Sequence, residues 1–202
     1  MFTPRRLSTL HFNAIDVYSV LHSLKPSLST GSDGIPNIIL KNCAVSLASP
    51  LASIFEISLR SHTLPKEWLS ANVRPIFKNK GVADKIENYR PISLTSTSCT
   101  VMEKIIKKHI SYFLCQNNLL VSQQHGFMEH KSTCSQLIEC FCDWIDAIEN
   151  QNSIDVIYID FAKAFDTIGH NKLAFKLEKY GITGYFEMDN IIFIQQNSTC
   201  CN

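Results

Sequence analysis

Long apolar runs are scarce in this sequence of 202 residues. The N-terminal segment has no apolar stretch with the flanks of a secretory signal peptide, and no segment approaches the roughly 20 apolar residues of a membrane-spanning helix. Internal repeats and low-complexity tracts are also missing. With a hydrophobic content of 45%, these features argue against a membrane-spanning or disordered protein and indicate a globular fold without a membrane partner.

Zinc-binding cysteine pairs are a second absence. The eight cysteines do not form the paired CxxC motifs that hold structural zinc. Disulfide frameworks belong mainly to small secreted domains, and this chain is neither short nor of secreted type. We therefore expect reduced thiols, buried or without a role, in an intracellular protein. The sequence does not distinguish the nucleus from the cytoplasm.

The net charge is close to zero, at +1, but the charges are unevenly distributed. Between residues 60 and 108 ten Lys and Arg oppose four Asp and Glu, which gives +6, whereas seven acids and one Lys between residues 129 and 160 give −6. A basic segment beside an acidic one fits a phosphate backbone at the first and metal chemistry at the second. Solvated helix faces produce the same pattern, so both interpretations stay open.

Helices dominate the predicted secondary structure. Apolar residues at helical spacing predict helices over residues 15–24, 45–61, 101–114, 134–149 and 171–181. The segments NVRPIF (72–77) and YRPISL (89–94) are typical of edge or distorted strands because each contains an Arg-Pro pair. An apolar strand over 155–161, between two helices, indicates a sheet covered on at least one face. We therefore predict a helix-rich α/β (α+β) fold.

Capping residues mark three of the predicted helix ends. Thr100 with Glu103, and Thr133 with Gln136, have the spacing of a capping box and predict two helix starts. Gly181 predicts a C-terminal cap, because glycine readily adopts the left-handed conformation that ends many helices.

A carboxylate closes the apolar segment 156–159. Asp160 follows that segment directly, and Asp166 comes six residues later. Acidic side chains at the end of a strand can hold Mg²⁺, which prefers oxygen ligands and commonly uses one or two carboxylates together with substrate phosphates. An aspartate after a strand can equally cap a turn or the next helix, so the residue pattern alone leaves both roles open.

The surrounding sequence favours the first role. YIDFAKAFDTIGHNKL (158–173) closely resembles the first catalytic motif of reverse transcriptases of non-LTR (LINE-type) retrotransposons, whose usual form is DFxKAFDxVxHxxL. Four upstream segments resemble the same family in the same order: GSDGIPNIILKN, LPKEWLSANVRPIFKNKG, NYRPISLTSTSCTVMEKII and LLVSQQHGFMEHKSTCSQL. The resemblance covers about residues 15–184. It implies a right-hand polymerase fold, with fingers and the finger–palm junction over 1–154, the first part of the palm over 155–184, and a divergent tail over 185–202.

The resemblance also implies roles for residues of the palm segment. Asp160 matches the first catalytic, metal-binding aspartate, and the backbone carbonyl of Phe161 would add a second metal ligand. Phe165 matches the bulky residue that packs under the sugar of the incoming nucleotide and rejects a 2′-hydroxyl. Phe161 and Phe165 therefore border the expected nucleotide site.

Basic residues of the upstream motifs match positions that contact phosphate. Lys78 and Arg90 correspond to finger residues that contact the nucleotide triphosphate or the template, and Lys131 to one that touches the template backbone. Arginine suits this role because its fork of donors grips phosphate, while lysine acts as a point charge. The implied partners are an RNA template, a DNA primer and a dNTP.

Nucleotidyl transfer of this kind implies two Mg²⁺ ions about 3.5–4 Å apart. At an effective dielectric near 20 their repulsion is roughly 17 kcal/mol, so one carboxylate does not suffice to hold both. The family's Gly-containing PQG motif and its [FY]xDD hairpin do not occur in these residues, and Asp189 is the single aspartate after Asp166. We expect a truncated domain that does not polymerise by itself.

Three interpretations of the chain follow. It is the inactive remnant of a polymerase, a piece of a working enzyme completed by a second chain that supplies the rest of the palm, or a non-catalytic nucleic-acid-binding or interaction module. The third requires the basic finger residues to form one face whose binding weakens steeply with salt.

Overall fold

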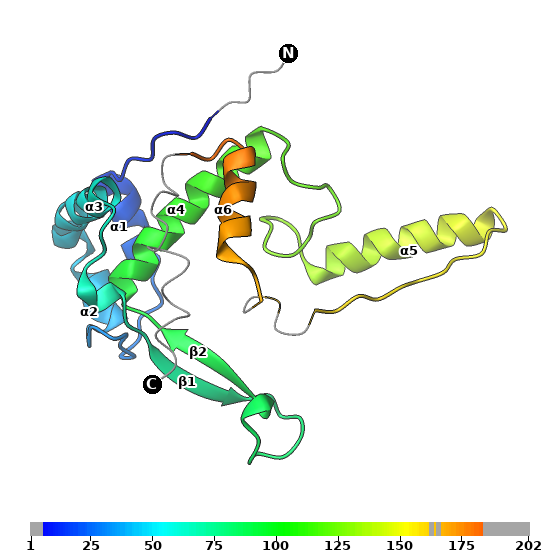
Figure 1. Cartoon of the computed structure of the whole chain (residues 1–202), viewed down its shortest axis with the longest axis horizontal. Coiled ribbons are helices and arrows are strands. Elements are labelled where there is room, and N and C mark those ends of the chain that lie inside the picture. The colour runs from blue at the N-terminus through cyan, green and yellow to red at the C-terminus, as the bar shows by residue number, and fades with distance from the viewer. Residues whose placement is uncertain (1–5, 162–163, 165–166, 184–202) are drawn as a thin grey trace. The chain divides into compact units, whose positions relative to one another are not determined.

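The computed structural model describes residues 6–161, 164 and 167–183 (Figure 1). These residues form two compact units: residues 6–113 with 169–183, and residues 114–161 with 164 and 167–168. The described part is rich in helix and contains a small antiparallel sheet of two strands. No helix within the described ranges is long and apolar enough to cross a membrane.

The first unit is organised around a core of helices. Helices α1 (Ala14–His22), α2 (Asn37–Asn42) and α3 (Ala44–Ser61) contact one another, and α4 (Thr97–Gln116) contributes buried residues to the same core (Figure 1). The most deeply buried large side chains of this core are Val17, Leu21, Phe55, Val101, Met102 and Ile105. Apolar residues three and four apart predict such a packed face, and the helices expected over 15–24 and 45–61 are confirmed within two residues.

Phe55 of α3 lies at the centre of this core and is fully buried. Its ring makes edge-to-face contacts with Phe12, at 5.4 Å between centroids, and with Trp68, at 5.7 Å. Burying a phenylalanine stabilises a fold by about 1.5–3 kcal/mol, and edge-to-face pairs add roughly 0.5–1.5 kcal/mol each. The aromatic cluster therefore joins three chain segments that are distant in sequence.

The antiparallel pair consists of β1 (Asn72–Phe77) and β2 (Tyr89–Leu94), which have the bounds predicted from the sequence. Pro75 lies opposite Pro91. The N–H of Lys78 donates to the carbonyl of Asn88 at 2.7 Å, so by alternation along the ladder the Pro75–Pro91 pair is one that exchanges no hydrogen bonds. Both prolines, which lack an N–H, are therefore accommodated inside the pair.

Gly31, in the loop between α1 and α2, lets that loop pack closely against the end of the strand pair. A Cβ placed on Gly31 would lie 2.2 Å from the carbonyl oxygen of Thr95, so no other residue fits without movement. The Gly31 carbonyl accepts from the side-chain amide of Asn72 at 3.5 Å, and the Thr97 hydroxyl donates to the Asn37 side chain at 2.5 Å. The loop between α1 and α2 thus contacts the start of β1 and the residue after β2, and the first residue of α2 contacts the start of α4.

Helix α6 (His170–Lys179) ends as the sequence predicts. Gly181 has a left-handed φ of +87°, and its N–H donates to Glu178 while that of Ile182 donates to Leu177, which is the Schellman pattern. The N–H of Leu7 donates to the Gly181 carbonyl at 2.9 Å, so this helix end is joined to the N-terminal segment of the same unit.

Both predicted capping boxes are wrong, although the helix expected over 134–149 is confirmed within one residue. Helix α4 begins at Thr97 rather than 101, and the hydroxyl of Ser96, not that of Thr100, accepts from the N–H of Cys99. Helix α5 (Thr133–Glu149) is capped by Ser132 and not by Thr133, in a reciprocal pair with Ser135. In both cases another hydroxyl residue one to four positions earlier satisfies the first N–H groups of the helix.

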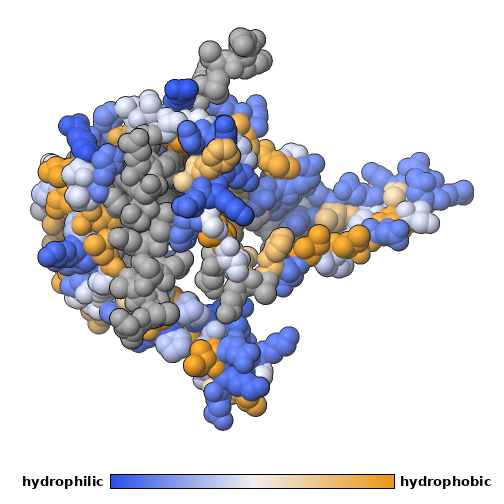
Figure 2. Space-filling model, viewed as in Figure 1, coloured by the Kyte–Doolittle hydropathy of each residue, from blue (hydrophilic) through white to orange (hydrophobic). Residues whose placement is uncertain are grey.

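The strand predicted over 155–161 does not form. These residues have no strand partner in the described part of the chain, and most of their apolar side chains are exposed. Helix α5 likewise buries none of its residues among the described ones, and apolar surface is visible along it in the space-filling view (Figure 2). A strand is defined by pairing with a neighbour, which the pattern of one segment cannot supply.

Glu56 links α3 to the N-terminal segment of the first unit. Its carboxylate accepts from the Phe12 N–H at 3.2 Å and contacts Arg60 at 3.0 Å and His11 at 3.3 Å. Partial burial favours the protonated form, but these hydrogen bonds together outweigh it and hold the pKa of Glu56 below its ordinary value of 4.5. A lowered folded-state pKa stabilises the fold above pH 4.5 and ceases to do so as the pH falls through the folded value.

We therefore expect Glu56→Gln to lower the free energy of unfolding at pH 7 by roughly 1 kcal/mol. The difference from the unchanged chain should shrink below pH 4.5, because the carboxylate of the unchanged chain is then protonated as well. Urea denaturation followed by circular dichroism at pH 7 and pH 3.5 measures both values. Glu87→Gln, at an exposed position, is the matched control, and an equal difference at both pH values would contradict the prediction.

Candidate nucleic-acid and nucleotide interface

One face of the β1–β2 pair brings two arginines together. Arg74 lies opposite Ile92, and Arg90 lies opposite Ile76. Because side chains alternate along a strand, these residues share one face, with Arg74 and Arg90 as diagonal neighbours whose Cα atoms are about 7–8 Å apart. Neither guanidinium has an ion-pair partner among the described residues. Their donors are therefore available to an anion.

Lys78 follows the last residue of β1 and lies two positions along the ladder from the Ile76–Arg90 pair. Its ammonium donates to the carbonyl of Glu87 at 2.7 Å. The side chain of Asn88 donates to Val82 at 2.7 Å, and Gly81 takes a left-handed φ of +84°, so the connecting loop is closed by its own hydrogen bonds. Lys78 keeps two further N–H donors for a phosphate.

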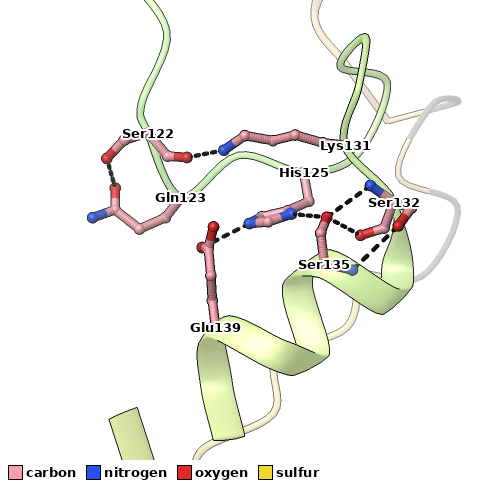
Figure 3. A network of polar contacts seen from close by, with 7 residues as sticks. All are labelled: Ser122, Gln123, His125, Lys131, Ser132, Ser135 and Glu139. Atoms are coloured by element: carbon pink, nitrogen blue, oxygen red, sulfur yellow. Dashed lines mark hydrogen bonds and ion pairs between the residues drawn. The ribbon is translucent and has the colours of Figure 1, made fainter. Parts of the chain in front are cut away.

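In the second unit, His125 organises the segment before α5 (Figure 3). Its side chain is buried, with Nε2 2.8 Å from Glu139 Oε2 and Nδ1 3.0 Å from the Ser135 hydroxyl. An ionised carboxylate only accepts hydrogen bonds, so Nε2 bears the proton that it donates to Glu139. Ser135 and Glu139 are one turn apart on α5, and one imidazole therefore bridges two turns of the helix.

Lys131 lies beside this network. Its ammonium donates to the carbonyl of Ser122, and the next residue, Ser132, caps α5 by accepting from the Ser135 N–H at 3.1 Å (Figure 3). The capping box is completed by the Ser132 N–H, which donates to the Ser135 hydroxyl at 2.9 Å. The segment that precedes α5 is thus held by side-chain hydrogen bonds at His125 and again at Lys131 and Ser132.

The predicted palm residues are placed differently from expectation. Asp160 and Phe161 lie in the exposed, unpaired segment 155–161, because the strand that should carry them does not form. Phe165 lies outside the described residues. Lys78 and Arg90 belong to the first unit, whereas Lys131, Asp160 and Phe161 belong to the second. The structure places Arg90 on β2 and Lys78 directly after the end of β1.

The described residues do not by themselves fit a magnesium site. No group of three or more His, Cys, Asp or Glu side chains among them could hold a metal ion. Asp160 supplies one carboxylate from an exposed segment, whereas Mg²⁺ demands near-octahedral oxygen ligation. No catalytic step through a metal follows from these side chains alone.

The six described cysteines are all reduced. Cys99 is buried, and burial, together with the neighbouring Glu103 carboxylate, raises the pKa of its thiol to about 12. A thiol in that state is a poor nucleophile and a poor metal ligand. Cys99 is therefore one of the buried thiols that the sequence predicts.

Sequence reasoning assigned no role to Arg74, His125, Ser135 or Glu139. The register of the strand pair, which no sequence pattern fixes alone, is what places Arg74 beside Arg90. The four-residue spacing of Ser135 and Glu139 was a usable signal, because it predicts one helix face. Nothing local indicated that His125 would be the partner of that face.

Replacing His125 tests the polar network directly. His125→Ala leaves Glu139 and Ser135 without their buried partner, and we expect a local destabilisation of roughly 1–3 kcal/mol. Amide hydrogen exchange of residues 122–139 should accelerate, as measured by mass spectrometry on peptides from this segment. His130→Ala, at an exposed position five residues away, is the control and should leave exchange unchanged. Equal protection in both variants would refute the structural role of His125.

Comparisons with known proteins place this chain in a family. A sequence model described as "Reverse transcriptase (RNA-dependent DNA polymerase)" matches residues 76–200. The chain is 28% identical over 171 residues to the "Probable RNA-directed DNA polymerase from transposon BS" of Drosophila melanogaster, an alignment that covers 85% of the chain and 19% of that protein.

Two further relatives from Drosophila melanogaster agree. The "RNA-directed DNA polymerase from mobile element jockey" is 25% identical over 164 residues (81% of the chain, 18% of the relative), and the "Probable RNA-directed DNA polymerase from transposon X-element" is 23% identical over 175 residues (87% and 19%). The chain spans about a fifth of the length of these curated relatives. It belongs to the reverse transcriptase (RNA-dependent DNA polymerase) family, and the predicted resemblance to the non-LTR, LINE-type branch is confirmed.

Proposed function

We propose that this chain forms the fingers and the first part of the palm of a right-hand RNA-directed DNA polymerase of a non-LTR retrotransposon. In this role it binds an RNA template, a DNA primer and a dNTP. The observation that carries the proposal is the matched family together with the basic face of the β1–β2 pair, where Arg74 and Arg90 lie side by side without anionic partners among the described residues.

The proposed roles follow the chemistry of the side chains. Arg90 and Lys78 contact the triphosphate of the incoming nucleotide or the template phosphates, since a guanidinium fork and an ammonium both donate to phosphate oxygens. Arg74 adds a second fork on the same face. Lys131, on the segment held by His125, contacts the template backbone. Phe161 and Phe165 border the sugar of the nucleotide.

Asp160 supplies one Mg²⁺ ligand in this proposal, with the Phe161 carbonyl as a second. The remaining carboxylates must come from outside the described residues or from a second polypeptide, because Asp160 has no acidic, histidine or cysteine cluster around it in the described ranges. When bound, two such ions would neutralise the charge that develops on the transferred phosphate. The chain alone is therefore proposed to be inactive in polymerisation.

Primer extension tests this directly. The purified 202-residue chain, given an RNA template, a DNA primer, dNTPs and Mg²⁺, should add no nucleotide. Adding a polypeptide that contains the rest of a related palm is the positive arm of the experiment, and Asp160→Ala is its control. Templated extension by the chain alone that Asp160→Ala abolishes would overturn the proposed inactivity.

A non-catalytic nucleic-acid-binding module is the second candidate. It is favoured by the contrast between a formed basic face on the β1–β2 pair and an Asp160 in an exposed, unpaired segment. In this role the chain binds RNA through Arg74, Lys78 and Arg90, and Asp160 has no function. The two candidates share the basic face and differ in what Asp160 does.

RNA binding should depend on that face and on salt. We expect Arg90→Ala to weaken binding of a single-stranded RNA oligomer and to reduce the slope of log affinity against log salt by about 0.7, the value for one lost phosphate contact. Fluorescence anisotropy at several salt concentrations measures both quantities. Arg6→Ala, at an exposed position outside the face, is the control. Unchanged binding in Arg90→Ala would refute the module and the template contact proposed for Arg90, whereas loss of binding in Asp160→Asn would refute the module.

A further inference from the structure

The segment Ser122–Lys131, here called the pinned loop, holds an unusual backbone conformation. Phe127 and His130 both lie in the left-handed region, with φ of 63° and 61°. Bulky residues rarely adopt this conformation, which costs roughly 1–3 kcal/mol and persists only where the surrounding structure enforces it. Backbone strain of this kind is concentrated at ligand-binding sites, which makes the pinned loop a candidate binding site.

Hydrogen bonds on both sides of Phe127 enforce the conformation. His125, two residues earlier, is buried and bonded through both ring nitrogens to α5 (Figure 3). Lys131, four residues later, donates to the Ser122 carbonyl and so closes the loop on itself. The side-chain amide of Gln124 donates to the Gly126 carbonyl at 3.0 Å. The backbone that carries Phe127 is therefore fixed on both flanks.

The fixed backbone presents an aromatic side chain to solvent. Phe127 is 83% exposed, although burying it would stabilise the chain by about 1.5–3 kcal/mol. The charges of the loop, Glu129 and Lys131, balance, so the loop is no strong electrostatic site for a phosphate backbone. An exposed ring on a backbone held at both flanks, with a lysine four residues later in the chain, is instead suited to a base, whose flat face stacks on an aromatic ring in any sequence.

We propose that Phe127 is a stacking platform for an unpaired base of the RNA template, with Lys131 contacting the adjacent phosphate. This inference rests on the proposed function, because it names the base-contacting residue of a chain already taken to bind RNA. The ring contributes affinity without sequence preference, and the Lys131 ammonium retains two N–H donors after its bond to Ser122. His125 acts as a positioning residue that holds the ring at a fixed place.

Substitution of Phe127 by glycine separates the ligand role from the fold. Glycine adopts a positive φ at no steric cost, so Phe127→Gly should fold at least as stably as the unchanged chain in urea denaturation. Its affinity for a single-stranded RNA oligomer should nevertheless fall about tenfold, within the range that loss of one base–aromatic stack produces. The slope of log affinity against log salt should stay the same, because no phosphate contact is lost, whereas Lys131→Met should reduce it by about 0.7.

A second RNA probe isolates the base. On an oligomer of equal length whose bases are replaced by abasic sugars, Phe127→Gly and the unchanged chain should bind equally, and Phe127→Trp should keep full affinity for the normal oligomer. Phe141→Ala, which removes an exposed ring from α5, is the matched control and should bind RNA as the unchanged chain does.

The possible outcomes separate the two proposals. If RNA binds and Arg90→Ala weakens it but Phe127→Gly does not, the stacking platform is overturned and the proposed function stands. An equal loss of affinity of Phe127→Gly for the normal and the abasic oligomers would also overturn it, since the ring would then act on the loop rather than on a base. An unchanged RNA affinity with a ring that instead contacts a protein partner would overturn it as well. If the unchanged chain binds no RNA, both proposals fall together.

Discussion

The register of the β1–β2 pair is the constraint on which the proposed interface depends. Two prolines face each other in a pair that exchanges no hydrogen bonds, and a shift of one residue would move one of them to a position where the ladder requires an N–H. The prolines that make each segment a poor central strand therefore also select one register. That register sets Arg74 and Arg90 on the same face, where a slip of one residue would turn the side chains of one strand to the other side.

The two compact units are stabilised by different kinds of interaction. The first has an apolar core in which Phe55 joins Phe12 and Trp68, and the close approach of Gly31 to Thr95 ties that core to the base of the strand pair. The second owes its described order to side-chain hydrogen bonds around His125, while α5 keeps its apolar side exposed (Figure 2). Side-chain hydrogen bonds of this kind fix the geometry of a segment well, but they contribute less to the free energy of folding than the burial of apolar side chains does.

In the proposed function the strand pair and the pinned loop would bind a nucleic acid through different interactions. The strand pair offers guanidinium forks, whose interaction with phosphate is long in range and weakened by salt. The pinned loop offers a ring, whose stacking on a base is short in range and nearly independent of salt. In the proposed function the first contributes affinity and the second fixes the position of one nucleotide.

The sequence by itself determined the family, the helices over 15–24, 45–61 and 171–181 to within about two residues, and both strands of the pair, because local periodicity and the Arg-Pro segments carry that information. It misplaced the start of α4 and chose the wrong cap for α5, because several hydroxyl residues near each end could cap the helix and only the folded backbone selects Ser96 and Ser132. It also predicted a strand over 155–161, since an apolar run looks the same with or without a neighbour to pair with. The neighbour of Arg74, the partners of His125 and the exposure of Phe127 were decided by tertiary structure alone, because each depends on residues that the chain brings together across a distance and not on its local pattern.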